Sequence, residues 1–131
     1  MSLVIREMRD ADADAVAGLV RGLARFIGVD FVPRLTGEAL LAARDLIDVV
    51  VAERDGRILG ACLGLMTFST WRGVRGLYIV DLFVDQELRG QNIGLRLLRE
   101  SARRAARKGA AFVKLEVDHG NDGAARFYAR I

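Results

Sequence analysis

Several residue types are nearly missing from this chain of 131 residues, and each shortage excludes a class of protein. A single cysteine, Cys62, excludes an internal disulfide and a cysteine-based metal cluster. A single histidine, His119, argues against a zinc site, so we expect no bound metal. The longest nearly uncharged apolar run, from Ile58 to Phe68, is too short to cross a bilayer. The first residues also lack the basic, apolar and small segments of a secretory signal, which predicts a cytoplasmic protein without a membrane partner.

What the chain does contain is the composition of one folded domain. Hydrophobic residues make up 52% and charged residues 28%, which excludes intrinsic disorder. The length suits one hydrophobic core. With a single proline and no low-complexity tract, there is no sign of a linker. We therefore expect a single domain over residues 1–131.

Lysine is also scarce, because only Lys108 and Lys114 among the 20 basic residues are lysines. The others are arginines, whose fixed fork of donors suits phosphates. Residues 89–108 hold many of these bases and one acid, Glu100. The cluster allows a nucleic-acid surface, a site for a small phosphorylated ligand, or a helix with a solvated basic face. Because no aromatic residue is interleaved with the arginines, and Trp71 is remote in sequence, we expect no nucleic-acid partner.

Hydrophobic periodicity predicts an alternation of strands and helices. The dipeptide Asp55-Gly56 is a strong hairpin signal between two of the strands. In chain order, we expect a strand over Leu3–Met8, helices capped by Asp12 or Asp14 and by Thr36, strands over Asp48–Arg54, Arg57–Phe68 and Leu77–Val84, a helix over Ile93–Lys108, a strand over Ala111–Asp118 and a helix over Asp122–Arg130. A meander followed by a strand–helix–strand crossover predicts an α/β fold with a mixed sheet and helices on its faces.

The most informative segment runs from Leu82 to Gly94, where an apolar strand passes through a short polar turn into a helix. Gly90 and Gly94 flank the turn. Such a turn directs several backbone N–H groups at one spot, and the helix N-terminus adds partial positive charge, so the segment predicts a pyrophosphate site. Arg89 would add a further donor. The glycines match neither the dinucleotide fingerprint nor a Walker loop, so an ordinary strand-to-helix turn is the alternative.

Two motifs in this sequence resemble the GNAT superfamily of N-acetyltransferases. The first is Leu-Phe-Val at 82–84 followed by Arg-Gly-Gln-Asn-Ile-Gly at 89–94 and Leu-Leu at 97–98. Asn92 stands where the family usually has a middle glycine, and asparagine tolerates a left-handed backbone better than most residues. The second is Leu-Glu-Val at 115–117, followed by Asn121, Ala124, Phe127 and Tyr128. The motifs stand in the family's order, and the resemblance covers most of the chain.

The resemblance implies a GNAT-type α/β domain that binds acetyl-CoA. The residues that it implies for cofactor binding are Leu82, Phe83, Val84, Arg89, Gly90, Gln91, Asn92, Ile93, Gly94, Leu95 and Asn121. In the family, two further strands follow a Gly-Phe phrase, and this chain stops at Ile131 before it, so those last two strands are expected to be missing. A sheet ending at the strand Ala111–Asp118 would leave an apolar edge unpaired, which predicts a homodimer or a larger assembly.

The resemblance also implies transfer of an acetyl group from acetyl-CoA to a primary amine of a small molecule or peptide. A free alkylamine has a pKa of about 10, so a general base must remove its proton and a general acid must protonate the leaving thiolate. Glu116 is the first candidate base: partial burial on an apolar strand would raise its pKa, and relatives that acetylate protein N-termini have a glutamate there. Asp81 is the second, at a position where relatives that acetylate polyamines carry an acidic pair, although Val80 replaces its first member. Tyr128 is the candidate acid, at the family's spacing from Asn121.

Each of these residues also has a purely structural interpretation. Glu116 would then lie on the solvent face of an edge strand, Tyr128 would be a core aromatic beside Phe127, and Asn121 would be a plain helix N-cap. For the whole chain, the alternative to an enzyme is a non-catalytic acyl-CoA-binding or regulatory module.

Overall fold

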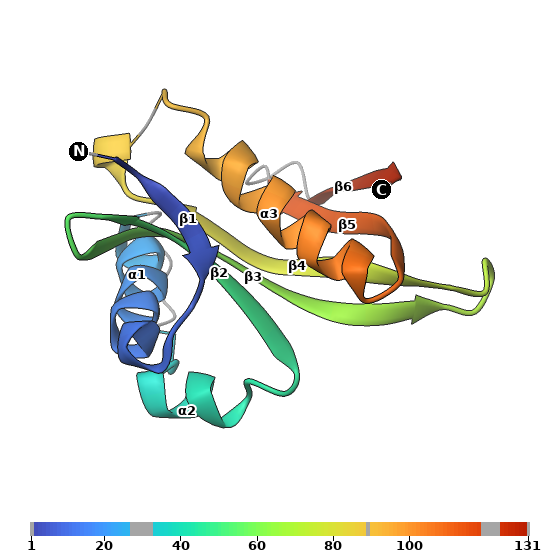
Figure 1. Ribbon diagram of the computed structural model, residues 1–131, viewed down its shortest axis with the longest axis horizontal. Coiled ribbons are helices and arrows are strands. Elements are labelled where there is room, and N and C mark those ends of the chain that lie inside the picture. The colour runs from blue at the N-terminus through green and yellow to red at the C-terminus, as the bar shows by residue number, and fades with distance from the viewer. Residues whose placement is uncertain (1, 27–32, 89, 119–123, 131) are drawn as a thin grey trace.

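The computed structural model describes residues 2–26, 33–88, 90–118 and 124–130 (Figure 1). Its elements follow the predicted order as far as residue 118. The strands are β1 (Val4–Glu7), β2 (Ile47–Arg54), β3 (Arg57–Ser69), β4 (Val74–Val84), β5 (Ala110–Asp118) and β6 (Ala124–Arg130). The α-helices are α1 (Ala13–Phe26), α2 (Gly37–Ala42) and α3 (Ile93–Arg107), and two short 3-10 helices are η1 (Asp10–Asp12) and η2 (Gln86–Leu88).

The described strands form one mixed sheet in the order of the chain, from β1 to β6. The pair β4–β5 is parallel because α3 connects it as a crossover, and the other neighbouring pairs are antiparallel. Asp55 and Gly56 turn β2 into β3 with φ angles of 53° and 78°. Left-handed backbone at both central residues is the mark of a type I′ turn, which suits a two-residue hairpin, so the hairpin predicted at this dipeptide is confirmed.

Helices cover both faces of the sheet, with α3 on one face and α1 and α2 on the other (Figure 1). The side chains of β2 alternate between the two layers. Val50 packs with Leu97 of α3, and Val51 packs with Val16 and Leu40 of the opposite helices. The α/β class with helices on both faces is therefore confirmed. No helix in the described part of the chain has the length and apolar character needed to span a bilayer.

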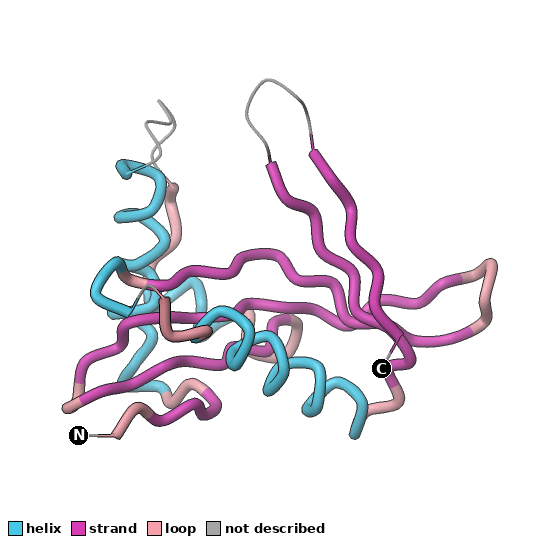
Figure 2. Tube along the Cα trace, turned by 90° about the horizontal axis from the view of Figure 1, so that it is seen from above, coloured by secondary structure: helices cyan, strands magenta, loops and turns pink. Residues whose placement is uncertain are grey.

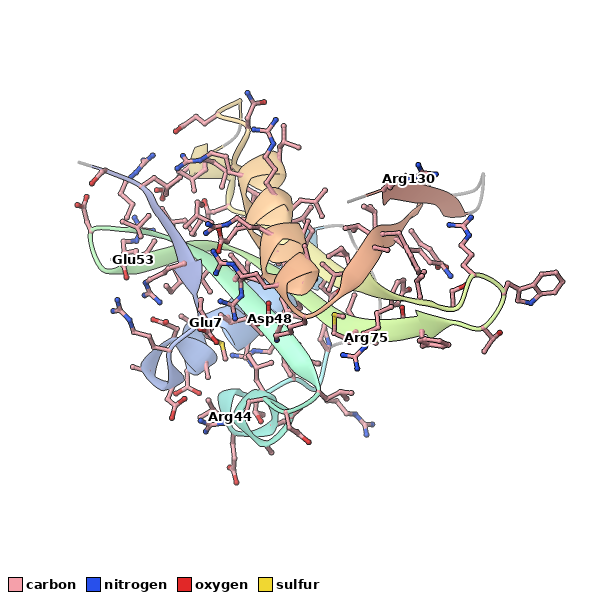
Figure 3. All side chains as sticks on the ribbon, turned by 45° about the vertical axis from the view of Figure 1, so that its right-hand side comes forward. Glu7, Arg44, Asp48, Glu53, Arg75 and Arg130 are labelled. Atoms are coloured by element: carbon pink, nitrogen blue, oxygen red, sulfur yellow. The ribbon has the colours of Figure 1, made fainter. Side chains whose placement is uncertain are left out.

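The C-terminal end of α3 is tied to the sheet by Arg104. Its guanidinium donates two hydrogen bonds to the Asp48 carboxylate of β2, from Nε at 3.0 Å and from Nη2 at 2.7 Å. Nη2 also lies 3.1 Å from Glu7 Oε1 at the end of β1. Figure 3 shows Glu7 and Asp48 side by side at this end of the sheet. Paired bonds to a carboxylate are geometrically specific, so they fix how α3 lies on the sheet.

The segment after β5 differs from the prediction. Residues 124–130 form β6, antiparallel to β5, where the sequence predicted a helix over Asp122–Arg130. The edge of β5 offers a row of backbone donors and acceptors, and Phe127 and Tyr128 have high β propensity. Pairing with this edge outweighs the local helical pattern.

The new strand also covers the edge of β5 that the sequence analysis expected to be open. The pairing runs from Phe112↔Arg130 to Asp118↔Ala124. The unpaired edge of β5 was the reason for predicting a homodimer, and β6 removes that reason. The oligomeric state itself is not tested and stays a prediction.

The single cysteine lies in the centre of the sheet and should be unreactive. Cys62 is fully buried on β3, and burial raises the pKa of its thiol to about 11. Because the thiolate is the reactive form, we expect Cys62 to react with an aromatic disulfide reagent more than ~10-fold slower in the folded protein than in urea at the same pH. Equal rates, measured by absorbance, would show that the β3 core opens readily.

Candidate active site

The parallel strands β4 and β5 pair along only part of their length. Their ladder ends at Ile79↔Leu115, whereas β4 stays paired with β3 as far as Val84. Figure 2 shows β5 and β6 turning away from the other strands. No described strand pairs with residues 80–84 on the β5 side. Within the described part of the chain, the backbone donors and acceptors on this side of β4 therefore have no strand partner and are candidates for binding a ligand.

A β-bulge marks the beginning of this opening. Leu63 of β3 pairs with Asp81, and the next residue, Gly64, pairs with Ile79, so Val80 is an extra residue in β4. A bulge bends its strand and re-aims the side chains around it. The opening therefore begins where β4 itself changes direction.

The turn before α3 adopts the backbone that a phosphate site needs. Gly90 and Asn92 have φ angles of 80° and 57°, both left-handed. The left-handed conformation expected of Asn92 is therefore observed. Asn92 is the N-cap residue of α3, and its side chain makes no capping hydrogen bond. The N–H groups of the first helical turn therefore point outward without a side-chain cap, as in an anion-binding helix start.

This helix start adjoins the open stretch of β4. A β-carbon placed on Gly94 would lie 3.7 Å from Cγ2 of Val84 and 4.0 Å from Cδ2 of Leu82. Both side chains are partly buried against the α3 layer of the core. A ligand held at the turn can therefore continue directly along β4.

The remaining residues predicted to bind the cofactor fall into two groups, one buried in the core and one exposed around the turn. Phe83 and Ile93 are buried in the core on opposite faces of the sheet, so their side chains position the strand and the helix. The exposed ones surround the turn and are Gly90, Gln91, Asn92 and Leu95. Arg89 and Asn121 lie outside the described residues.

The sequence analysis missed Arg54, which reaches the turn from the end of β2. Its Nη2 donates a hydrogen bond of 3.3 Å to Oε1 of Gln91. Its buried Nε has no hydrogen-bond partner in the described part of the chain. Since 37 residues separate Arg54 from Gln91, only the fold brings this guanidinium to the site, and no local pattern could have indicated it.

Asp81 follows the bulge and lies half-buried beside the opening. Residues paired across antiparallel strands share a face, so pairing with Leu63 places Asp81 on the face covered by α1 and α2. Burial raises the pKa of this carboxyl above its ordinary value. A raised pKa next to an opening in a sheet is a mark of a candidate general base.

Glu116 lies on β5, one residue beyond the last β4–β5 pair. Val113 and Leu115 pack toward α3, so the alternation of the strand places Glu116 on the opposite face, the one that also carries Asp81. It lines a cavity of about 550 Å³ together with Tyr78 and Lys114. The fold thus brings both predicted carboxylates to one face, but Glu116 is exposed and lacks the partial burial that was expected.

Tyr128 lies on β6, where it pairs with Lys114 of β5. The sequence analysis placed it on a helix, whereas it lies on a strand. Its acid role therefore rests on the motif alone and stays a prediction.

Taken together, the opening in the sheet and the helix start define a class of enzyme. An acyltransferase that uses a long thioester must bind its phosphates at one end and lead its arm to the acceptor at the other. The turn before α3 and the open side of β4 follow each other in the order that such a cofactor requires.

Comparison with known proteins identifies the family. The chain belongs to the Acetyltransferase (GNAT) family, which matches residues 26–131, and is therefore an acetyl-CoA-dependent N-acyltransferase. It is 32% identical over 139 residues to thialysine N-epsilon-acetyltransferase of Sus scrofa, with 97% of this chain and 81% of the relative covered. The enzyme of the same name from Mus musculus is 28% identical over 136 residues, covering 95% and 79%.

A solved structure supports the fold. It is an aminoglycoside acetyltransferase from an uncultured soil metagenomic sample, in complex with trehalose. It superimposes with a TM-score of 0.76 at 22% identity, covering 92% of this chain and 80% of that one. At this identity, the likeness concerns the fold alone.

Proposed function

We propose that this protein transfers the acetyl group of acetyl-CoA to a primary amine of a small molecule or peptide, with Asp81 as the general base. The observation that carries the proposal is the half-buried Asp81 beside the opening between β4 and β5. Relatives named for acetylating thialysine, which carries amines, support an amine acceptor.

The described residues fit acetyl-CoA at the turn and along β4. Gly90 has open space where a side chain would stand, so a phosphate can approach its backbone. The uncapped start of α3 and the guanidinium of Arg54 supply donors for the pyrophosphate. The open backbone of residues 80–84 would hold the arm of the cofactor. Acetyl-CoA, when bound, supplies the thioester whose acetyl group is transferred.

Asp81 would accept a proton from the ammonium form of the acceptor, because the protonated nitrogen has no free electron pair with which to attack the thioester. At pH 7, only about one in a thousand alkylamines is neutral, so a base at the point of reaction matters. A carboxyl whose pKa is raised by burial accepts that proton more readily than an ordinary one. Glu116, on the same face, would hold the ammonium of the incoming acceptor. The alternative assignment exchanges the roles of the two carboxylates.

Tyr128 is the proposed acid that protonates the leaving thiolate through its Oη. We expect Tyr128→Phe to lower kcat about 10²-fold and to leave the affinity for CoA within ~2-fold, since only the hydroxyl is removed. Steady-state kinetics and calorimetry measure the two quantities. An unchanged kcat would return Tyr128 to a structural role.

The direct test of the proposal is turnover. Purified protein is incubated with acetyl-CoA and, separately, with polyamines, aminoglycosides, amino acids and peptides with free N-termini, and release of CoA is followed. Acetylation of at least one amine, dependent on Asp81, supports the proposal. Binding of CoA without turnover of any amine would favour the non-catalytic acyl-CoA-binding module.

A further inference from the structure

The exposed side of α3 carries a row of arginines. They stand three or four residues apart, so they share one side of the helix, and their members are Arg96, Arg99, Arg103 and Arg107. Arg103 is paired with Glu100. The other arginines of the row make no hydrogen bond or ion pair with any residue that the structure describes. The row therefore presents positive charge that the described part of the chain does not neutralise.

This arrangement is unfavourable for the helix itself. Like charges three or four residues apart repel each other on a helix surface. The same helix shows the opposite arrangement at Arg104, which is held by Asp48 and Glu7. Near the turn before α3, Arg57 is likewise paired with Glu87. Like charges left together against the local rule are typical of a functional surface, and here they suit a ligand of negative charge.

The row begins next to the proposed cofactor site. An α-helix rises about 1.5 Å per residue, which places Arg96 about 4.5 Å and Arg99 about 9 Å along the axis from Ile93, the first residue of α3. Arg107 is about 21 Å away on the same scale. Because the screening length in physiological salt is about 8 Å, the charges of Arg96 and Arg99 act at the turn, whereas that of Arg107 is largely screened there.

The first two arginines of the row nevertheless face away from the path proposed for the cofactor arm. Arg96 and Arg99 line a shallow groove of about 240 Å³ together with Ile5 of β1. In the sheet, β1 and the opening between β4 and β5 lie on opposite sides of β2 and β3. Their position therefore suits attraction through solvent better than contact with the bound arm.

We propose that Arg96 and Arg99 draw acetyl-CoA from solution to its site by long-range electrostatic attraction. This inference rests on the proposed function and adds to it a control on the rate of cofactor binding. Acetyl-CoA carries a pyrophosphate and a separate phosphate, which amount to about four negative charges at neutral pH. Positive charge beside a site raises the rate of encounter with such a ligand, and salt weakens the effect. The arginines therefore act on the association rate constant, kon, and not on the dissociation rate constant, koff.

The first test measures binding kinetics. CoA with a fluorophore on its sulfur is mixed with the protein by stopped flow, and unlabelled CoA then displaces it to give koff. At about 10 mM ionic strength, where screening extends to about 30 Å, we expect Arg96→Gln and Arg99→Gln each to lower kon about 3-fold, and the double variant about 10-fold. We expect koff to stay within ~2-fold, and kon to become equal for all proteins in about 0.5 M salt. A kon that responds neither to salt nor to these variants would overturn the inference.

Matched variants separate attraction at a distance from direct contact. Arg96→Lys keeps the charge and loses the fork of donors, so it should keep the kon of the wild type. Arg107→Gln removes the same charge from the far end of the row and should change kon less than ~1.5-fold in physiological salt. If Arg96→Gln raised koff and Arg96→Lys did not restore it, Arg96 would contact the bound cofactor and the inference would be wrong.

A second ligand tests the charge of the cofactor. Dephospho-CoA, labelled in the same way, lacks the separate phosphate, so its kon should fall less steeply with salt than that of CoA. Equal salt dependence for the two ligands would contradict the inference. Association that depends on the arginines, with no amine acetylated, would contradict the proposed function and keep this inference. Acetylation of an amine with a kon that salt leaves unchanged would overturn this inference alone.

Discussion

Replacing Asp81 by asparagine should lower kcat by roughly 10²- to 10⁴-fold and leave the affinity for CoA nearly unchanged. The substitution keeps the shape of the side chain and removes its ability to accept a proton. The wild-type rate should fall toward low pH with a midpoint above the ordinary aspartate range, because burial raises the pKa of Asp81. That acidic limb should disappear from the residual activity of the variant.

Two further variants decide whether this effect belongs to Asp81. Asp55→Asn makes the same chemical change in the β2–β3 turn, where asparagine also adopts the left-handed backbone, and should keep full activity. Glu116→Gln should act mainly on KM for the acceptor. If Glu116→Gln instead abolished the acidic limb while Asp81→Asn stayed active, the base would be Glu116, as the sequence first indicated.

The same Asp81→Asn variant should also be more stable than the wild type at neutral pH. Burial disfavours the ionised carboxylate, so the folded state loses stability as pH rises through the raised pKa of Asp81. Asparagine carries no such cost. We expect a higher Tm for the variant at pH 7 and convergence of the two proteins below about pH 4, where aspartate is protonated in both states. A lower Tm at every pH would mean that the carboxylate stabilises the fold.

The second large effect concerns cofactor binding at the start of α3. A ligand present at 100 times its Kd stabilises the native state by about 2.7 kcal/mol, which for this chain length raises Tm by roughly 10 °C. We expect CoA to produce such a shift in the wild type and Gly94→Glu to abolish it. The added carboxylate stands where the phosphates are proposed to bind. The helix itself should tolerate the change, because a β-carbon at Gly94 meets its neighbours at ordinary contact distance.

Matched variants separate charge from folding. Gly94→Ala tests the small side chain alone and should keep most of the shift. Gly22→Glu introduces the same acid on α1, where a β-carbon meets nothing within 4 Å, and should leave CoA binding intact. Arg54→Gln should reduce the shift without abolishing it, since Arg54 adds one guanidinium to the turn. A full shift in folded Gly94→Glu protein would place the cofactor elsewhere.

The parts of the fold that local chemistry controls were predictable from the sequence. Asp55-Gly56 favours a hairpin because both residues tolerate left-handed backbone, and the continuous apolar run of β2 suits a strand with helices on both faces. The turn before α3 was predictable for the same reason, since Gly90 and Asn92 suit its two left-handed positions.

What depends on distant pairing was not predictable. The bulge at Val80 arises from the register between β3 and β4. The sequence of β4 alone does not indicate this register, so the bulge could not be predicted from it. The segment 124–130 has a helical pattern, yet it becomes β6 because the edge of β5 lies beside it. The burial that distinguishes Asp81 from Glu116 likewise depends on the helices packed over each strand, and so does the approach of Arg54 to the turn.

The opening between β4 and β5 also determines which part of the molecule should unfold locally before the rest. The β5–β6 hairpin joins the rest of the sheet through the five residue pairs from Arg75 to Ile79, whereas β3 and β4 pair along nearly their full length. Such a hairpin can detach as a unit at a lower free energy than global unfolding, and its amide hydrogens should exchange sooner than those of β2 and β3. A thioester cofactor lying across the opening would suppress this detachment. The lifetime of the enzyme in the presence of a protease would then rise and fall with the concentration of acetyl-CoA, because the protein without cofactor exposes the hairpin to cleavage.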